Sequence, residues 1–130
     1  MTEPRWLARR TVDAIHEEQI VEHGGANGLR DGGLLDSALS APQQQYAYSS
    51  DDAFNLAATY AERIAKNHPF IDGNKRTAFL AAYTFLAANG YELMASEEEA
   101  TERTLALAAG GIGQQEYAAW PRANTTKDSG

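Results

Sequence analysis

The segment Asp52–Asn89 reads DAFNLAATYAERIAKNHPFIDGNKRTAFLAAYTFLAAN and predicts two helices joined by a short loop. Its apolar residues recur at the three- and four-residue spacing of a buried helical face. Pro69 disfavours helical geometry at the residue before it, so the first helix has to end near Asn67. The second helix begins after Gly73. The stretch His68–Thr77 therefore links the two helices and opens the second one.

The rest of the chain predicts four further helices, because it is rich in alanine and poor in β-branched residues. We expect these helices over Trp6–Glu22, over Gly33–Leu39, from the capping box at Ser96 to Gly110, and over Gln114–Trp120. Proline interrupts a helix interior, so one helix should end before Pro42 and the last should end at Pro121.

With 130 residues and 14.1 kDa, the chain has the size of one domain. The predicted fold class is all-α, a compact bundle of about six helices with a short flap or hairpin. The polar stretch Gln43–Asp52 predicts that flap, as a loop or a weak edge hairpin. We expect a single domain over residues 1–123 and a polar, frayed tail over residues 124–130.

Composition excludes several classes of function. The chain has no cysteine, which rules out disulfides, iron–sulfur clusters, thiolate zinc sites and cysteine nucleophiles. A formal net charge of −7 argues against direct nucleic acid binding. No apolar run approaches the ~20 residues that span a bilayer, and the N-terminus lacks the pattern of a signal peptide. We expect a cytoplasmic protein without a membrane partner.

Four residues at the start of the second helix favour an anionic ligand. A helix N-terminus carries partial positive charge and unpaired N–H groups, so it binds phosphate readily. Gly73 allows close approach of the backbone, and Asn74 adds an amide donor. Lys75 and Arg76 add two cations, and an arginine can bind a phosphate through two hydrogen bonds. Cations oppose the dipole at this end of a helix, which itself points to a ligand.

Two further residues of the same stretch suggest chemistry. Asp72 places a carboxylate beside the phosphate site, and Mg²⁺ is bound by one or two carboxylates together with phosphate oxygens. His68 is the nearby base whose unperturbed pKa lies close to neutrality. A base, a metal-binding carboxylate and a phosphate site are the components of phosphoryl or nucleotidyl transfer.

Each of these residues also has a purely structural interpretation. Asp72 can serve as the N-cap of the second helix, and His68 can close the first helix. Lys75 and Arg76 can form a solvated face, and Gly73–Asn74 can form only a turn. Their concentration in ten residues makes the functional interpretation the stronger one.

Outside this stretch, the candidates are weaker. His16 and His23 are interpreted as core-edge or surface residues, and Arg30–Asp31 as an ion pair or a cap after a glycine-rich turn. The chain contains no Walker A sequence, no GxGxxG motif after a strand and no HExxH motif.

The stretch His68–Thr77 resembles the signature HxFx(D/N)GN(G/K)R of the Fic/Doc family. The lysine at position 75 resembles the Doc (death-on-curing) branch, whose members are toxins of type II toxin–antitoxin pairs. The similarity extends over residues 5–121 and includes Gly24–Leu39, GGANGLRDGGLLDSAL.

This resemblance implies ATP and Mg²⁺ as cofactors and gives each matching position a role. His68 would be the general base, and Asp72 would bind Mg²⁺. Gly73 and Asn74 would hold phosphates. Lys75 and Arg76 would act in both catalysis and phosphate binding.

The resemblance also implies an activity. Mainstream Fic enzymes carry Gly at the position of Lys75 and a second Arg at that of Phe79. Both differences favour γ-phosphate transfer to a protein Ser/Thr hydroxyl over AMP transfer. The implied target is elongation factor Tu, whose modification inhibits translation.

The implied partner is an antitoxin whose disordered segment folds on the toxin. AMP transfer and a catalytically silent module that binds an antitoxin or nucleotide remain the alternatives. The flap at Gln43–Asp52 would dock the target segment as an added strand.

Overall fold

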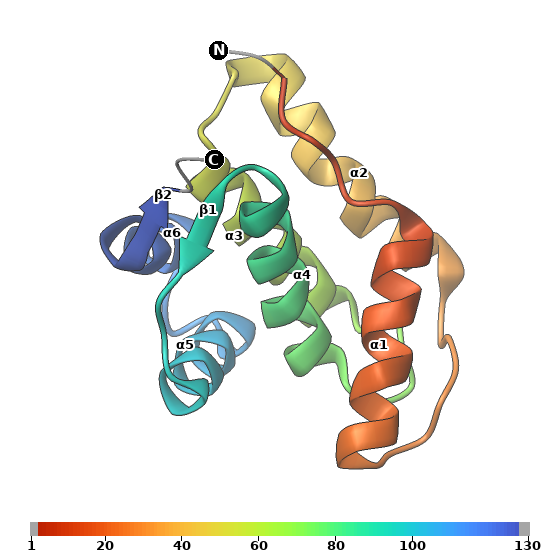
Figure 1. Cartoon of the computed structure of the whole chain (residues 1–130). Coiled ribbons are helices and arrows are strands. Elements are labelled where there is room, and N and C mark those ends of the chain that lie inside the picture. The colour runs from red at the N-terminus through yellow and green to blue at the C-terminus, as the bar shows by residue number, and fades with distance from the viewer. Residues whose placement is uncertain (1–2, 128–130) are drawn as a thin grey trace.

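The computed structural model describes residues 3–127, which form six helices and one small antiparallel sheet (Figure 1). The helices are α1 (Arg9–His23), α2 (Gly32–Ser49), α3 (Ala53–Asn67), α4 (Asn74–Ala88), α5 (Glu97–Ala109) and α6 (Gln114–Asn124). The strands are β1 (Tyr91–Leu93) and β2 (Thr125–Lys127), paired with Leu93 opposite Thr125. This architecture confirms the predicted all-α fold class.

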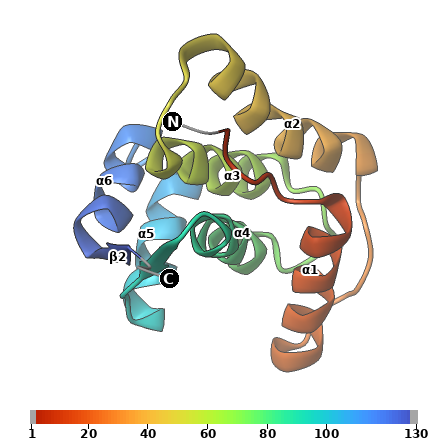
Figure 2. The same cartoon turned by 45° about the horizontal axis from the view of Figure 1, so that its top comes forward.

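The long helices α3 and α4 form the centre of the molecule. α3 packs against α4, α2 and α6, while α1 and α5 pack against α4. Figures 1 and 2 show α1 on one side of α4, with α5 and α6 on the other side. Four alanines of α3, at positions 57, 58, 61 and 65, are fully buried, and their small side chains allow neighbouring helices to approach closely. The loop between α3 and α4 is thereby fixed at both ends by the core.

The prediction for the region before α3 was wrong. Instead of ending at Leu39, α2 continues through Pro42 to Ser49, so Gln43–Asp52 is mostly helix and not a loop or hairpin. The apolar stripe of α2 continues as well, because Pro42 is itself buried and the Tyr46 ring packs against Trp6 with centroids 5.8 Å apart. These tertiary contacts outweigh the hydrogen bond that proline cannot donate.

Two other boundaries differ from the sequence-based expectation. α6 does not end at Pro121, which is buried inside the helix, but continues to Asn124. The expectation of a frayed tail is wrong for Thr125–Lys127, which pairs with β1; residues 128–130 lie outside the described part of the chain.

At the N-terminal side, α1 begins at Arg9 rather than at Trp6. Trp6 and Leu7 lie before the helix and contact the core. The Trp6 ring stacks on Phe85 with centroids 5.9 Å apart, and the Leu7 N–H donates to the Tyr60 hydroxyl at 3.1 Å.

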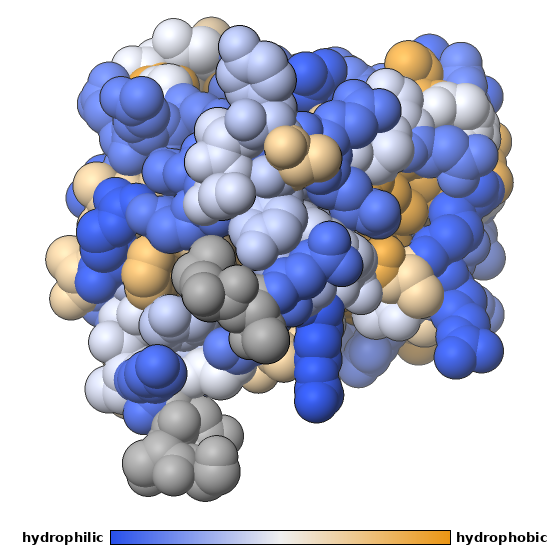
Figure 3. Space-filling view, turned by 90° about the horizontal axis from the view of Figure 1, so that it is seen from above, coloured by the Kyte–Doolittle hydropathy of each residue, from blue (hydrophilic) through white to orange (hydrophobic). Residues whose placement is uncertain are grey.

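Surface character is consistent with a globular domain. The face seen in Figure 3, opposite to the end where α4 begins, is mainly hydrophilic with smaller apolar areas. Within residues 3–127, no helix combines the length and the apolar character needed to cross a bilayer.

Candidate functional site

All six predicted site residues line one cleft of about 400 Å³ at the start of α4. They are His68, Asp72, Gly73, Asn74, Lys75 and Arg76. Thr101 and Leu105 of α5 form the facing wall. The structure therefore brings together residues that the sequence could only place near one another along the chain.

The N-terminus of α4 is open toward this cleft. Gly73 precedes the helix with φ +80°, and no side chain caps the helix. The Thr77 N–H bonds to the Gly73 carbonyl at 3.0 Å, as in a regular first turn. The N–H groups before Thr77 have no carbonyl within the helix, since the helix has no preceding turn. These donors, together with the positive end of the helix dipole, suit an anion.

The glycine at position 73 is required by the backbone conformation. A Cβ built there would lie 3.4 Å from Ile20 Cδ1 and 3.5 Å from His16 Cδ2, which are ordinary contacts with α1. Residues with a side chain rarely adopt this positive φ, and glycine adopts it readily. The structure thus gives Gly73 a backbone role, and its close approach to a phosphate stays a prediction.

Phe70 and Asn74 hold the loop to the core. Phe70 is 2% exposed and belongs to the hydrophobic core. The Asn74 side chain accepts from the Phe70 N–H at 3.0 Å and donates to the Phe70 carbonyl at 2.9 Å. Asn74 is buried, so its amide first of all closes the loop, and its predicted contact with phosphate depends on the remaining N–H hydrogen.

His68 is exposed and adopts a left-handed conformation, with φ +49° and ψ +55°, at the C-cap of α3. Arg30 fixes this strained residue from a distant segment. Its Nε donates to the His68 carbonyl at 2.6 Å, and its Nη2 donates to the Asn67 carbonyl at 2.7 Å. Arg30 thus closes the end of α3, and the His68 imidazole is not needed for that purpose.

Asp72 is exposed and does not cap α4. Its Oδ2 accepts from the Ala26 N–H at 2.7 Å, which ties the cleft to the loop between α1 and α2. That loop comes close because Gly25 faces Asp72; a Cβ on Gly25 would lie 3.2 Å from the Asp72 Cβ. The N-cap interpretation of Asp72 is therefore wrong, and Oδ1 is not used by that contact.

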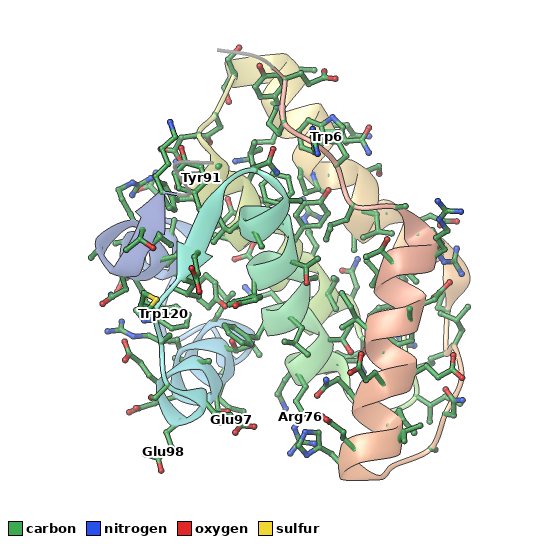
Figure 4. All side chains as sticks on the ribbon, viewed as in Figure 1. Trp6, Arg76, Tyr91, Glu97, Glu98 and Trp120 are labelled. Carbon is green, nitrogen blue, oxygen red and sulfur yellow. The ribbon has the colours of Figure 1, made fainter. Side chains whose placement is uncertain are left out.

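Lys75 and Arg76 are both exposed, and neither forms an ion pair within residues 3–127. Arg76 lies at the end of the molecule where α4 begins, the same end at which Glu97 and Glu98 open α5 (Figure 4). The two cations line the cleft although they oppose the helix dipole. Their charge is thus available to a ligand.

The donor set fits a magnesium–phosphate ligand. Mg²⁺ keeps several waters and takes few protein ligands, so the one carboxylate of Asp72 beside open N–H groups is sufficient. Among residues 3–127, no group of three or more His, Cys, Asp or Glu residues is arranged to hold a metal without a ligand's help.

A second, larger cleft of about 770 Å³ adjoins the first, with Lys75 and Arg76 in both. Beyond these two cations, α4 contributes Phe79, Leu80 and Tyr83 to its wall. Phe79 packs toward Trp120, with ring centroids 6.1 Å apart. The position that carries a second arginine in mainstream Fic enzymes is therefore part of an aromatic cluster.

Sequence reasoning missed three contributors to the site, all from the segment before α2. The loop between α3 and α4 is held at its two ends by Arg30 and by the Ala26 N–H. His16 lies beneath this loop. For Arg30 and Ala26 the available signal was the glycine-rich turn after Gly24, and His16 was interpreted only as a core-edge or surface residue. The interpretation of Asp31 as a cap is confirmed, since its side chain accepts from the Leu34 N–H.

Comparisons with known proteins test the family resemblance of the sequence. The sequence model of the Fic/DOC family matches residues 6–86. "Protein kinase doc" of Escherichia phage P1 is 35% identical over 109 residues, which cover 83% of this chain and 86% of that protein. "Toxin Doc" of Mycolicibacterium smegmatis is 44% identical over 78 residues, or 58% and 59% of the two chains. The chain therefore belongs to the Fic/Doc family, in its Doc branch.

Proposed function

We propose that this protein is the toxin of a type II toxin–antitoxin pair and acts as a protein kinase. It would transfer the γ-phosphate of ATP to a Ser or Thr hydroxyl of a target protein. The observation that carries this proposal is the single cleft in which a base, a carboxylate, two cations and an uncapped helix N-terminus meet. The names of the two relatives, a protein kinase and a toxin, support it.

The transfer requires a base for the target hydroxyl. In this proposal the exposed imidazole of His68 takes the proton as the hydroxyl oxygen attacks the γ-phosphorus. The bond between the γ-phosphorus and the bridging oxygen breaks, and ADP leaves with the electron pair. Arg30 keeps the base in place through the backbone carbonyls at the end of α3.

The remaining residues stabilise charge. The N–H groups that open α4, together with Lys75 and Arg76, would hold the phosphates and the negative charge that develops during transfer. Asp72 would hold Mg²⁺ through the carboxylate oxygen not bonded to Ala26. When bound, Mg²⁺ supplies further neutralisation of phosphate charge.

Two positions favour γ-phosphate transfer over AMP transfer. Lys75 adds bulk and charge where mainstream Fic enzymes have glycine. Phe79 packs in an aromatic cluster and cannot bind a phosphate. AMP transfer remains the second candidate, because the open helix N-terminus would hold an α-phosphate equally well. A silent binding module is the third, and the complete set of residues in the cleft argues against it.

For the biological context, we propose elongation factor Tu as the target and inhibition of translation in the cytoplasm as the result. A cognate antitoxin with a segment that folds on binding would keep the toxin silent. Direct binding of nucleic acid plays no part in the proposal. The residues Gln43–Ser49 are helical, so docking of the target on a flap hairpin in this region is not proposed again.

Labelled ATP tests the chemistry directly. The purified protein is incubated with elongation factor Tu and with ATP labelled at either the α- or the γ-phosphate. Label from the γ-position on the target supports the kinase, and label from the α-position shows AMP transfer. Absence of both labels, together with growth arrest on expression, would favour the silent module.

Two variants test the assigned roles. His68→Asn removes the base but tolerates the left-handed backbone, so it should fold normally and lose at least about a hundredfold in transfer rate. Asp72→Asn should weaken the dependence of the rate on Mg²⁺. An unchanged Mg²⁺ titration in Asp72→Asn would exclude the metal-binding role of this carboxylate.

A further inference from the structure

A buried histidine from α1 lies directly beneath the candidate site. His16 is 3% exposed, and its ring stacks on Phe70 with centroids 3.8 Å apart and an interplanar angle of 7°. Because Phe70 is the anchor of the loop, the imidazole supports the loop from the side opposite to the cleft. A hydrophobic ring would fill this space equally well, so stacking does not by itself explain a polar residue here.

The polar atom of the ring has a specific partner. His16 Nε2 lies 2.7 Å from the Asp72 carbonyl oxygen. A carbonyl oxygen only accepts, so Nε2 carries the hydrogen and donates it. The same ring edge lies against the next residue, since a Cβ on Gly73 would be 3.6 Å from Nε2. One imidazole therefore contacts the loop from Phe70 to the start of α4.

This hydrogen bond fixes the peptide that joins Asp72 to Gly73. In a trans peptide the C=O and the following N–H point in opposite directions. A carbonyl held toward α1 therefore turns the Gly73 N–H away from α1. The same restraint fixes the Cα of Asp72, from which the carboxylate extends to Ala26 and into the cleft.

We propose that His16 is a positioning residue for the nucleotide site. By holding the Asp72 carbonyl it orients two ligand-binding groups at once, the Asp72 carboxylate and the N–H groups at the start of α4. The proposal rests on the proposed function, because it assumes that this cleft binds a magnesium nucleotide.

Two substitutions in the full chain separate the hydrogen bond from the stacked ring. His16→Phe keeps an aromatic ring on Phe70 and removes the donor. His16→Gln loses the ring but can place a side-chain N–H near the same carbonyl. Val21→Phe is the matched control, since Val21 lies on the same helix, is 81% exposed and lines neither cleft.

Binding of the non-hydrolysable analogue AMP-PNP with Mg²⁺ is measured by titration calorimetry, and folding is followed by the thermal midpoint. For His16→Phe we expect a dissociation constant raised by about tenfold, the size expected for one hydrogen bond. His16→Gln should recover part of this loss, while Val21→Phe should match the unmodified protein. Affinity equal to the unmodified protein in both His16 variants would overturn the proposal.

The position of the Gly73 N–H provides a readout that needs no nucleotide. In ¹H–¹⁵N spectra of the free protein, His16→Phe, which keeps an aromatic ring beside Gly73 but removes the donor, should shift the Gly73 amide resonance. If the unmodified protein binds no AMP-PNP, the proposed function fails, and His16 is then judged by this resonance alone. An unchanged Gly73 resonance in His16→Phe would show that the imidazole only fills space.

Discussion

The starts of α4 and α5 lie at the same end of the molecule but have opposite chemistry (Figure 4). The start of α5 is capped by its own residues. The Ser96 side chain accepts from the Glu99 N–H at 3.1 Å, and three glutamates occupy the first turn. The start of α4 has no side-chain cap and carries Lys75 and Arg76. In α5, acidic side chains compensate the positive end of the helix dipole. In α4, the side chains of the first turn do not.

This difference separates stability from function. The acidic first turn and the cap of α5 stabilise that helix without a ligand. The cations of α4 oppose its dipole and are compensated only when an anion binds. Changes at α5 should therefore lower stability, and changes at α4 should lower activity.

The largest effect is expected at the first turn of α4. Arg76→Ala should reduce the phosphate transfer rate by about a hundredfold, since it removes a charged donor from the developing negative charge. Its thermal midpoint should stay close to that of the unmodified protein. Arg103→Ala, on the exposed face of α5, is the control and should retain full activity. Equal losses in both variants would show that overall charge, not the site, is responsible.

High pH should weaken the packing behind α5. Tyr117 of α6 is 1% exposed, and burial raises its pKa to about 12, against a smaller opposite effect of its hydrogen bond to Thr104. The unfolded chain loses this proton near pH 10, so the stabilising effect of Tyr117 is complete below pH 10 and is lost as pH rises toward 12. The difference between a pKa of 10 in the unfolded chain and about 12 in the folded protein corresponds to about 2–3 kcal/mol of stability.

Urea unfolding at several pH values measures this effect. Tyr117→Phe should be less stable than the unmodified protein at pH 8, because Thr104 loses its partner, and should show a flatter decline above pH 10. Tyr48→Phe, which removes an exposed phenol, is the control. A slope unchanged by Tyr117→Phe would assign the alkaline sensitivity to other groups.

Two glycines provide a matched pair across the two helices. Gly73 precedes α4 with φ +80°, and Gly110 follows α5 with φ +81°. Alanine at either position should cost roughly 1 kcal/mol, because both demand a left-handed backbone. Only Gly73→Ala should also weaken binding of AMP-PNP, since relief of the strain rotates the peptide that opens α4. Titration calorimetry measures AMP-PNP binding by both variants. Weaker binding by Gly110→Ala would contradict the proposed difference between α4 and α5.

The smallest effect is expected at the cap of α5. Ser96→Ala should lower the free energy of unfolding by about 1 kcal/mol, because the Glu99 N–H loses its acceptor. The transfer rate of the folded protein should not change. Urea denaturation and the labelled-ATP assay measure the two quantities on the same sample, and a loss of activity without a loss of stability would reverse the assignment.

Local patterns predicted the elements that depend on local forces. Pro69 and Gly73 mark the ends of the loop between α3 and α4, and the capping box at Ser96 marks the start of α5. Prediction failed where packing overrides a local rule. Pro42 and Pro121 both lie inside helices, because burial of their rings and of neighbouring apolar side chains outweighs one missing hydrogen bond.

The sequence by itself determined the residues that can do chemistry here, because His68–Thr77 is continuous and its helix boundary is local. The way these residues are held depends on long-range packing. Arg30, Ala26 and His16 reach the loop from elements that lie 38 to 56 residues away in the chain. Such contacts depend on the packing of α1 and its following loop against α4. Spacing along the chain does not specify where a side chain points across such a distance.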